Sequence, residues 1–368
     1  MAARPSTTLT KPRFDTHDSY GVILLSRPNI TIDGLLDRNI TTIQIILDAS
    51  LKDAFNYDCR QYYDHYYQII HDFIQHVVNV FVVQNRFSYA FTDYMSVMFP
   101  KKNDREYRGR RIEPTNISHI SGTFAVFNNK RTDKRIDLTG MTTQELNFLK
   151  NPCISRNTTF MDNSYWSCKN HEHTPINLLR PPYVDPVNDF SKLSVQFPKG
   201  KHNTHRDGDF NNSDNMLMKI INREFAEETK NLTTDTSMTP SYTFITQLDR
   251  YKSLFWVDTR YTIFGRNNLH FALATYNTPA EPMITPIVNN EIRLYAWIPL
   301  NVAIDIMEQD CGYPAIIRWI INKLAIAFYS KLRVDPNITF DRAIQALIQI
   351  IKNKKEISYQ VMQDLRSM

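Results

Sequence analysis

Residues 197–229 read FPKGKHNTHRDGDFNNSDNMLMKIINREFAEET. Ser213 is a good helix N-cap, and the apolar residues that follow it recur at helical spacing. Glu224, Glu227 and Glu228 are related as i, i+3 and i+4, so the predicted helix carries its carboxylates on one face. Like charges at this spacing repel by about 0.2–0.5 kcal/mol per pair unless a cation neutralises them. Because Mg²⁺ favours carboxylate oxygens, this face is either a metal site or a solvated acidic surface.

The segment upstream of this helix favours the metal site. The loop at residues 199–201 and the run Arg-Glu-Phe-Ala-Glu-Glu at residues 223–228 together resemble the Nudix box. That pattern is Gly, five residues, Glu, seven residues, then Arg-Glu-U-x-Glu-Glu-x-Gly-U, where U is aliphatic. The resemblance places the box at residues 200–232 and implies Mg²⁺ or Mn²⁺ as cofactor. It implies metal-binding carboxylates, a catalytic arginine and a phosphate loop, namely Glu224, Glu227 and Glu228, then Arg223, then Lys199, Gly200 and Lys201.

The match departs from the pattern in three places. The spacing from Gly200 to Arg223 is nine residues longer than in the pattern, so the loop between them carries an insertion. Asn215 stands where the pattern has Glu, which weakens the ion pair that usually braces the box arginine. Lys230 replaces the final Gly, although Asn231 next to it can adopt a left-handed helix cap.

More of the chain resembles one branch of this family, the mRNA-decapping Nudix enzymes of large DNA viruses. These include the poxvirus, African swine fever virus and mimivirus types, and the length and the Asn/Ile-rich composition are most like the mimivirus type. About half of the chain is covered, while residues 28–78 and 302–368 match nothing in the branch. The matching segments are SYGVILLSR at 19–27, VFVVQNRFSYAFTDYMSVMF at 80–99, LTGMTTQELNFL at 138–149 and NNEIRLYAWIPL at 289–300.

The resemblance implies an enzyme that removes the 5′ cap of mRNA and releases m7GDP and 5′-monophosphate RNA. It implies that Glu291 is a further ligand or the general base, and that Tyr89 stacks on the cap. A methylated purine is cationic and is held well between aromatic faces. Phe271 is the second stacking candidate and His270 the alternative, although a core position remains open for each aromatic residue. The branch also implies a viral protein of the host cytoplasm or the virion that acts in host shutoff.

A dense basic loop is the candidate contact for the RNA body. Its cations are Lys101, Lys102, Arg105, Arg108, Arg110 and Arg111. A solvated surface loop would have the same composition. Two other functions remain open, a Nudix hydrolase of small diphosphates (a nucleotide or a diphosphoinositol polyphosphate) and an RNA-binding protein with an inactive Nudix fold. Cys153, Cys168, His171 and His173 do not have the usual spacing of a zinc site.

Composition supports a folded, mildly basic protein. The 368 residues include 42% hydrophobic residues and carry a net charge of +5, which permits a polyanionic partner without requiring one. Four scattered cysteines and a polar N-terminus without an apolar leader favour a reducing compartment. Charges interrupt the apolar run Ala315–Leu332, which therefore predicts a buried or amphipathic helix and no membrane partner.

These observations predict an α/β fold, a Nudix α/β/α sandwich with a mixed sheet, split by a helical insertion and followed by C-terminal helices. The predicted organisation starts with a flexible tail at 1–17 and a first Nudix part at 18–100, which contains a helical insert near 40–78. A basic and helical insertion at 101–185 separates it from a second Nudix part at 186–301. A helical extension at 302–368 follows. Thr142 with Glu145 forms a predicted capping box within the insertion. The oligomeric state is not specified by any of these patterns.

Overall fold

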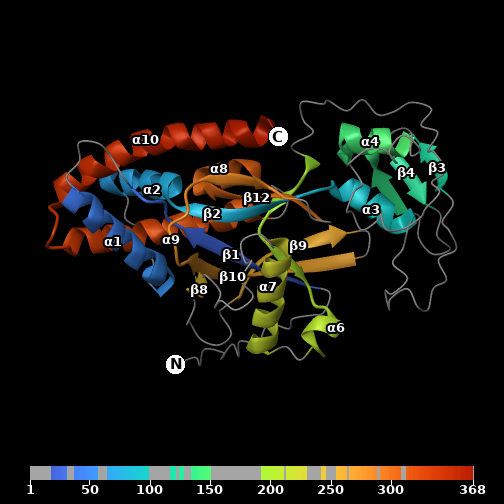
Figure 1. Ribbon diagram of the computed structural model, residues 1–368, viewed down its shortest axis with the longest axis horizontal. Coiled ribbons are helices and arrows are strands. Elements are labelled where there is room, and N and C mark those ends of the chain that lie inside the picture. Colours follow the sequence, from blue (N-terminus) through green and yellow to red (C-terminus); the bar gives the residue numbers. More distant parts are fainter. Residues whose placement is uncertain are drawn as a thin grey trace, which may run out of the picture.

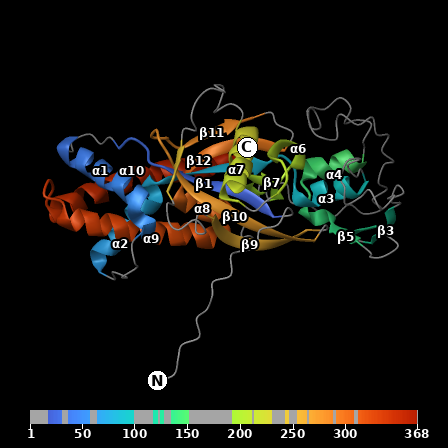
Figure 2. The same cartoon turned by 90° about the horizontal axis from the view of Figure 1, so that it is seen from below.

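A computed structural model shows a mixed α/β protein with a mixed sheet and helices on both of its faces (Figures 1 and 2). It describes residues 18–30, 37–56, 64–98, 117–121, 124–127, 134–150, 192–210, 213–229, 242–245, 254–262, 265–287, 291–307 and 312–367. The predicted α/β class with a mixed sheet is confirmed.

In the described part of the chain, the main sheet has the order β11-β12-β2-β1-β10-β8, with β6 on β2, β7 on β1 and β9 on β10. The pair β1–β10 is parallel and the other pairs are antiparallel. The strands are β1 (Ser19–Ser26), β2 (Asn79–Asn85), β6 (Val195–Gln196), β7 (Lys199–Lys201), β8 (Tyr242–Phe244), β9 (Leu254–Thr262), β10 (Gly265–Tyr276), β11 (Met283–Pro286) and β12 (Ile292–Pro299).

The two central strands β1 and β2 pair only over a short distance and then diverge. Leu25 and Ser26 of β1 pair with β2, whereas residues 19–21 of β1 pair with β7. At the far end of β2, Val83 and Gln84 pair with β6. The segment β6–β7 therefore fills the space between the diverging strands and continues directly into the loop that precedes α7 (Asp214–Glu228).

Both faces of the sheet are buried, because successive side chains of a strand point to opposite faces. On β1, Tyr20, Val22 and Leu24 pack on the face covered by α7. Ile23 and Leu25 pack on the other face, against the large helical layer. A strand that is buried on both faces reads as a continuous apolar run, which is how GVILL appears in the sequence.

The helical layer joins segments that are far apart in sequence. Its members are α1 (Asp37–Asp53), α2 (His65–Val77), α8 (Leu300–Ile306), α9 (Tyr313–Val334) and α10 (Phe340–Ser367). Helices therefore occur both in the predicted insert near 40–78 and after Pro299, with Pro336 between the last two as expected. α9 contains the run Ala315–Leu332 and is largely buried. None of the described helices combines the length and apolar character that a membrane crossing needs.

A smaller lobe lies at the end of the sheet away from α1 and α2 (Figures 1 and 2). It contains α3 (Tyr89–Met98), the strands β3 (Ile117–Ser121), β4 (Phe124–Phe127) and β5 (Lys134–Asp137), a 3-10 turn (Leu138–Gly140) and α4 (Thr143–Lys150). The predicted capping box is confirmed, because the Thr142 N–H donates to Glu145 Oε2 at 2.7 Å and the Glu145 N–H donates to Thr142 Oγ1 at 3.2 Å.

Candidate active site

The predicted acidic helix is α7, and its N-cap is Ser213. The Met216 N–H donates to Ser213 Oγ at 3.2 Å, which satisfies one of the free donors of the first turn. Leu217, Ile221 and Phe225 are buried against the sheet. The apolar face thereby fixes the rotation of the helix, and the carboxylates of its last turns lie beside β7.

Gly200 makes the closest approach between β7 and the helix. A Cβ atom at this position would lie 1.8 Å from Glu224 Cδ and 2.0 and 2.2 Å from the carboxylate oxygens. Gly200 pairs with Tyr20 of β1, so the sheet holds the backbone in place. Only a residue without a side chain allows this contact. The predicted phosphate loop, Lys199 to Lys201, is therefore strand β7, and it packs directly on the Glu224 carboxylate.

Glu228 is the most buried carboxylate of the three, with 7% of the residue exposed. Its Oε2 accepts the Lys199 N–H at 3.1 Å. Burial raises the pKa of Glu228 well above its ordinary value; the Lys199 charge opposes this, and the charges of Glu224 and Glu291 raise the pKa further. A buried carboxylate that is compensated only in part is suited to bind a cation.

Glu291 lies close enough for its charge to act on this cluster. Burial also raises the pKa of Glu224, the Arg223 guanidinium opposes that shift, and the charge of Glu291 adds to it. The Glu291 carbonyl accepts the Arg86 N–H at 2.8 Å, which ties the start of β12 to the end of β2. The charge of Glu291 therefore acts on Glu224 and Glu228 although more than sixty residues separate them in the sequence.

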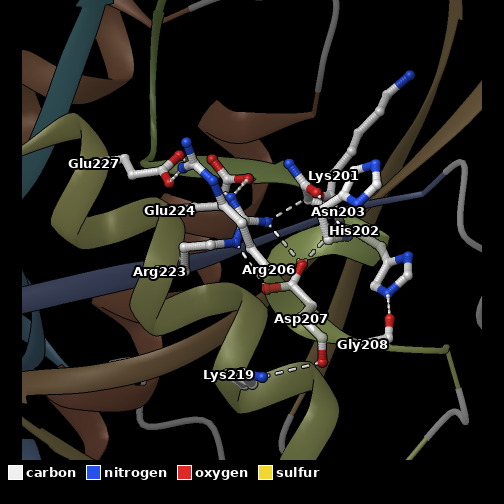
Figure 3. A network of polar contacts seen from close by, with 11 residues as sticks. Lys201, His202, Asn203, Arg206, Asp207, Gly208, Lys219, Arg223, Glu224 and Glu227 are labelled. Atoms are coloured by element: carbon white, nitrogen blue, oxygen red, sulfur yellow. Dashed lines mark hydrogen bonds and ion pairs between the residues drawn. The ribbon is translucent and has the colours of Figure 1, made fainter. Parts of the chain in front are cut away.

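Asp207, which the sequence pattern did not single out, braces Arg223 (Figure 3). The side chain of Asp207 is 0% exposed and accepts Arg223 Nε at 2.8 Å and Nη2 at 3.0 Å. Its Oδ2 also accepts the Asn203 N–H at 2.7 Å. Burial acts to raise the pKa of Asp207, but the Arg223 and Asn203 donors outweigh it and leave the pKa below its ordinary value. In the motif, a glutamate at the position of Asn215 would pair with the arginine. Here Asn215 is an exposed residue of α7, and Asp207 forms the ion pair with Arg223 instead.

Asp207→Asn is expected to lower the free energy of unfolding near neutral pH by about 2 kcal/mol, the scale of a hydrogen bond to a charged partner. The side chain keeps its size, but Arg223 loses its charged acceptor. Because the pKa of Asp207 is lowered in the folded state, this stabilisation exists above the ordinary value of 3.8 and disappears as pH falls through the lowered value. Urea unfolding at neutral and acidic pH measures the difference. Asp209→Asn, an exposed change two residues away, is the control, and an equal loss in both variants would contradict the role of Asp207.

Glu227 is engaged by two arginines. Arg223 Nη1 lies 3.3 Å from Glu227 Oε2, which is the predicted i, i+4 pair, and Arg206 from the inserted loop pairs with Glu227 Oε1. Within the described residues, no group of three His, Cys, Asp or Glu side chains stands in a metal-binding arrangement. The donors suit a hard cation in kind, since they are all carboxylate oxygens. Each Glu227 oxygen contacts an arginine, and because a carboxylate oxygen has more than one lone pair, these contacts do not prevent Glu227 from binding a cation.

The predicted stacking residues differ in position. Tyr89 is half-buried at the start of α3; its hydroxyl donates to Gln196 Oε1 at 3.0 Å and lies 3.2 Å from the Ser194 hydroxyl. The same Gln196 oxygen accepts Lys199 Nζ, so Tyr89 is linked to the predicted phosphate loop. Tyr89 is therefore placed at the candidate site.

The assignment of Phe271 as a stacking residue is wrong in this structure. Phe271 is 0% exposed and packs edge-on against Phe197 and Tyr313, with ring centroids 5.3 and 5.9 Å away. It cannot present a face to a ligand, because β10 turns this side chain into the core. His270 is also buried; it stacks on Tyr20 at 5.5 Å, and its Nε2 lies 3.1 Å from Asp18 Oδ2.

The predicted basic loop at 101–111 and the cysteine and histidine residues at 153–173 lie outside the described residues. Comparison of the chain with known protein families, with curated proteins and with solved structures finds no match in any of the three. The interpretation of the site therefore rests on its geometry and on the motif.

Proposed function

We propose that the chain is a metal-dependent Nudix pyrophosphohydrolase that removes the 5′ cap of mRNA, giving m7GDP and 5′-monophosphate RNA. The observation that carries the proposal is the meeting of three distant segments. Gly200 of β7 packs on Glu224 of α7, the Lys199 N–H of β7 donates to Glu228 of the same helix, and Glu291 before β12 adds its charge to both carboxyl groups, whose pKa values are raised.

Each of these groups has a role that suits cleavage of a phosphoanhydride. Glu224 and Glu228, joined by Glu227, would hold Mg²⁺ or Mn²⁺, which supplies charge neutralisation at the phosphates and an activated water. Arg223 orients Glu224, whose Oε1 lies 2.6 Å from its Nη1, and is itself fixed by Asp207. Glu291 is a further ligand or the base that accepts the proton of the attacking water.

Positive charge and an aromatic ring border the acidic cluster. Lys199 of β7 lies beside it, whereas the Lys201 side chain points away from the carboxylates (Figure 3); both are proposed to contact the phosphate oxygens of a substrate. Tyr89 is linked to Lys199 through Gln196 and supports recognition of a methylated base by stacking. The loop at 101–111 remains the predicted contact for the RNA body, and a viral origin with action in the host cytoplasm remains part of this proposal.

A competition assay tests the proposal. Release of cap from cap-labelled RNA is measured with Mn²⁺ while unlabelled cap dinucleotide or long uncapped RNA is added. We expect uncapped RNA to inhibit well and the dinucleotide poorly, because a truncated substrate loses the remote contacts that position the reacting phosphates. Strong inhibition by the dinucleotide with none by uncapped RNA would instead indicate a hydrolase of small diphosphates. Cap release by the Glu227→Gln variant, which lacks a proposed metal ligand, measures the background rate of the assay.

A further inference from the structure

A second buried carboxylate, Glu145, lies in the smaller lobe, outside the acidic cluster on α7. It belongs to α4, and 1% of the residue is exposed. Burial raises the pKa of Glu145, against the opposing effect of hydrogen bonds from Ser88 and Thr142. Burial of a carboxyl group has a free-energy cost that its hydrogen bonds must offset. The partners of Glu145 therefore indicate which part of the fold it stabilises.

The Glu145 carboxylate accepts hydrogen bonds at the N-termini of two helices, α4 and α3. Its Oε2 accepts the Thr142 N–H at 2.7 Å, which caps its own helix α4. Its Oε1 accepts the Ser88 N–H at 2.7 Å, and Oε2 also accepts the Ser88 hydroxyl at 2.6 Å. Ser88 Oγ in turn accepts the Phe91 N–H at 3.2 Å and so caps α3. Carboxylates are stabilised at helix N-termini, and here both helices contribute to one group.

This contact fixes the backbone immediately before Tyr89. Ser88 is the residue that precedes Tyr89, and its backbone N–H, its hydroxyl and its own cap bond all involve Glu145 or α3. Phe91 continues the contact by packing on Phe148 of α4 at 5.8 Å between ring centroids. Gly140, in the turn before α4, also lies close to α3, because a Cβ atom at Gly140 would lie 3.2 Å from Ala90 Cβ. The position of the Tyr89 ring therefore depends on α4.

We propose that Glu145 is a positioning residue that sets the affinity of the site for the base of the cap by holding Tyr89 in place. The inference rests on the proposed function. The phosphate chemistry takes place at α7, β7 and Glu291, none of which Glu145 touches. Loss of Glu145 should therefore weaken recognition of the base and leave turnover at saturating substrate unchanged.

The test compares Glu145→Gln with Thr142→Ala and Tyr89→Ala. Glutamine keeps the size of the side chain but has only one acceptor oxygen for the Ser88 and Thr142 donors. Thr142→Ala removes the hydroxyl acceptor of the Glu145 N–H and the contact of that hydroxyl with the Glu145 carboxylate, and it leaves both contacts to Ser88. Binding of 7-methyl-GDP is measured by calorimetry, kcat and KM are measured on cap-labelled RNA, and hydrogen exchange is followed at residues 88–92.

We expect Glu145→Gln to weaken 7-methyl-GDP binding about tenfold, to raise KM similarly, and to leave kcat within about twofold, on the scale of one unsatisfied buried donor. Exchange at residues 88–92 should accelerate. Thr142→Ala should lower the melting temperature without changing the affinity. If Glu145→Gln does not fold, Ser88→Ala replaces it, with an expected weakening of about threefold, because this change removes both the hydroxyl bond to Glu145 and the cap bond to the Phe91 N–H.

The outcomes separate the inference from the function on which it rests. Absence of cap release from labelled RNA by the unmodified protein would overturn the decapping function. Binding that Tyr89→Ala weakens and Glu145→Gln leaves unchanged would overturn only the role of Glu145. A fall of kcat in Glu145→Gln with KM unchanged would also overturn it, because that pattern indicates the loss of an interaction made only in the transition state.

Discussion

Glu228→Gln is expected to lower the kcat of cap release by about 100- to 1000-fold, the scale for losing one preorganised electrostatic group. Glutamine has the size of glutamate, so the packing of α7 against the sheet is kept while the charge that would bind the cation is lost. Cap release from labelled RNA at saturating Mn²⁺ measures the effect. Glu356→Gln, an exposed change on α10, is the matched control and should leave kcat unchanged. Near-normal turnover of Glu228→Gln at saturating metal would contradict the metal assignment.

The same variant should change the dependence of stability on pH. The pKa of Glu228 is raised by burial, so the metal-free fold favours the protonated form. The contribution of protonated Glu228 to the free energy of unfolding is fully present below its ordinary pKa of 4.5 and is lost as the pH rises through the raised pKa. Glutamine does not titrate, so in EDTA the melting temperature of Glu228→Gln should exceed that of the unmodified protein increasingly as pH rises to neutrality.

Added Mn²⁺ should reverse this order near neutral pH. A ligand that binds only the folded state at a hundred times its Kd stabilises it by about 2.7 kcal/mol. The unmodified protein should gain this stabilisation, and Glu228→Gln should gain much less. Thermal melts in EDTA and in Mn²⁺ give both results. Equal stabilisation of the two proteins by Mn²⁺ would place the cation elsewhere.

Gly200→Ala is expected to reduce kcat by about 100-fold, because displacement of a catalytic group by about 1 Å can have that effect. The new methyl group would lie 1.8 Å from Glu224 Cδ, and the pairing of β7 with β1 prevents the backbone from yielding. Glu224 must therefore leave its position beside Arg223. Because the new methyl group meets only the far end of the flexible Glu224 side chain, the free energy of unfolding should fall by less than the roughly 1–3 kcal/mol that is typical of an overpacked core.

A double-mutant cycle shows whether the effect of Gly200→Ala passes through Glu224. If it does, Gly200→Ala combined with Glu224→Gln should be no less active than Glu224→Gln alone. Additive losses would contradict the direct contact. Gly208→Ala is the control for replacement of a loop glycine: Gly208 has φ of 88° and no atom within 4 Å of an added Cβ. It should lose stability by about 1–3 kcal/mol through backbone strain and keep its kcat.

The sequence by itself determined the features that depend on residues close together in the chain. Helical spacing gave the acidic face of α7 and the pair of Arg223 with Glu227, and the capping patterns located Ser213 and the Thr142–Glu145 box. The apolar run of β1 was also readable, as a strand. In each case the interacting groups lie within a few residues, so the geometry of one helix or strand fixes their distance.

The tertiary structure alone decided the contacts between distant segments. Asp207 replaces the missing glutamate because the loop after β7 folds back over α7, a path that the longer spacing conceals. Phe271 is lost from the candidate site because the register of β10 on β1 turns it into the core. Burial and the approach of Glu291 raise the pKa values of Glu224 and Glu228, and Glu145 reaches across to Ser88. Strand register and the packing of layers set these distances, and both depend on contacts between residues that are far apart in the sequence.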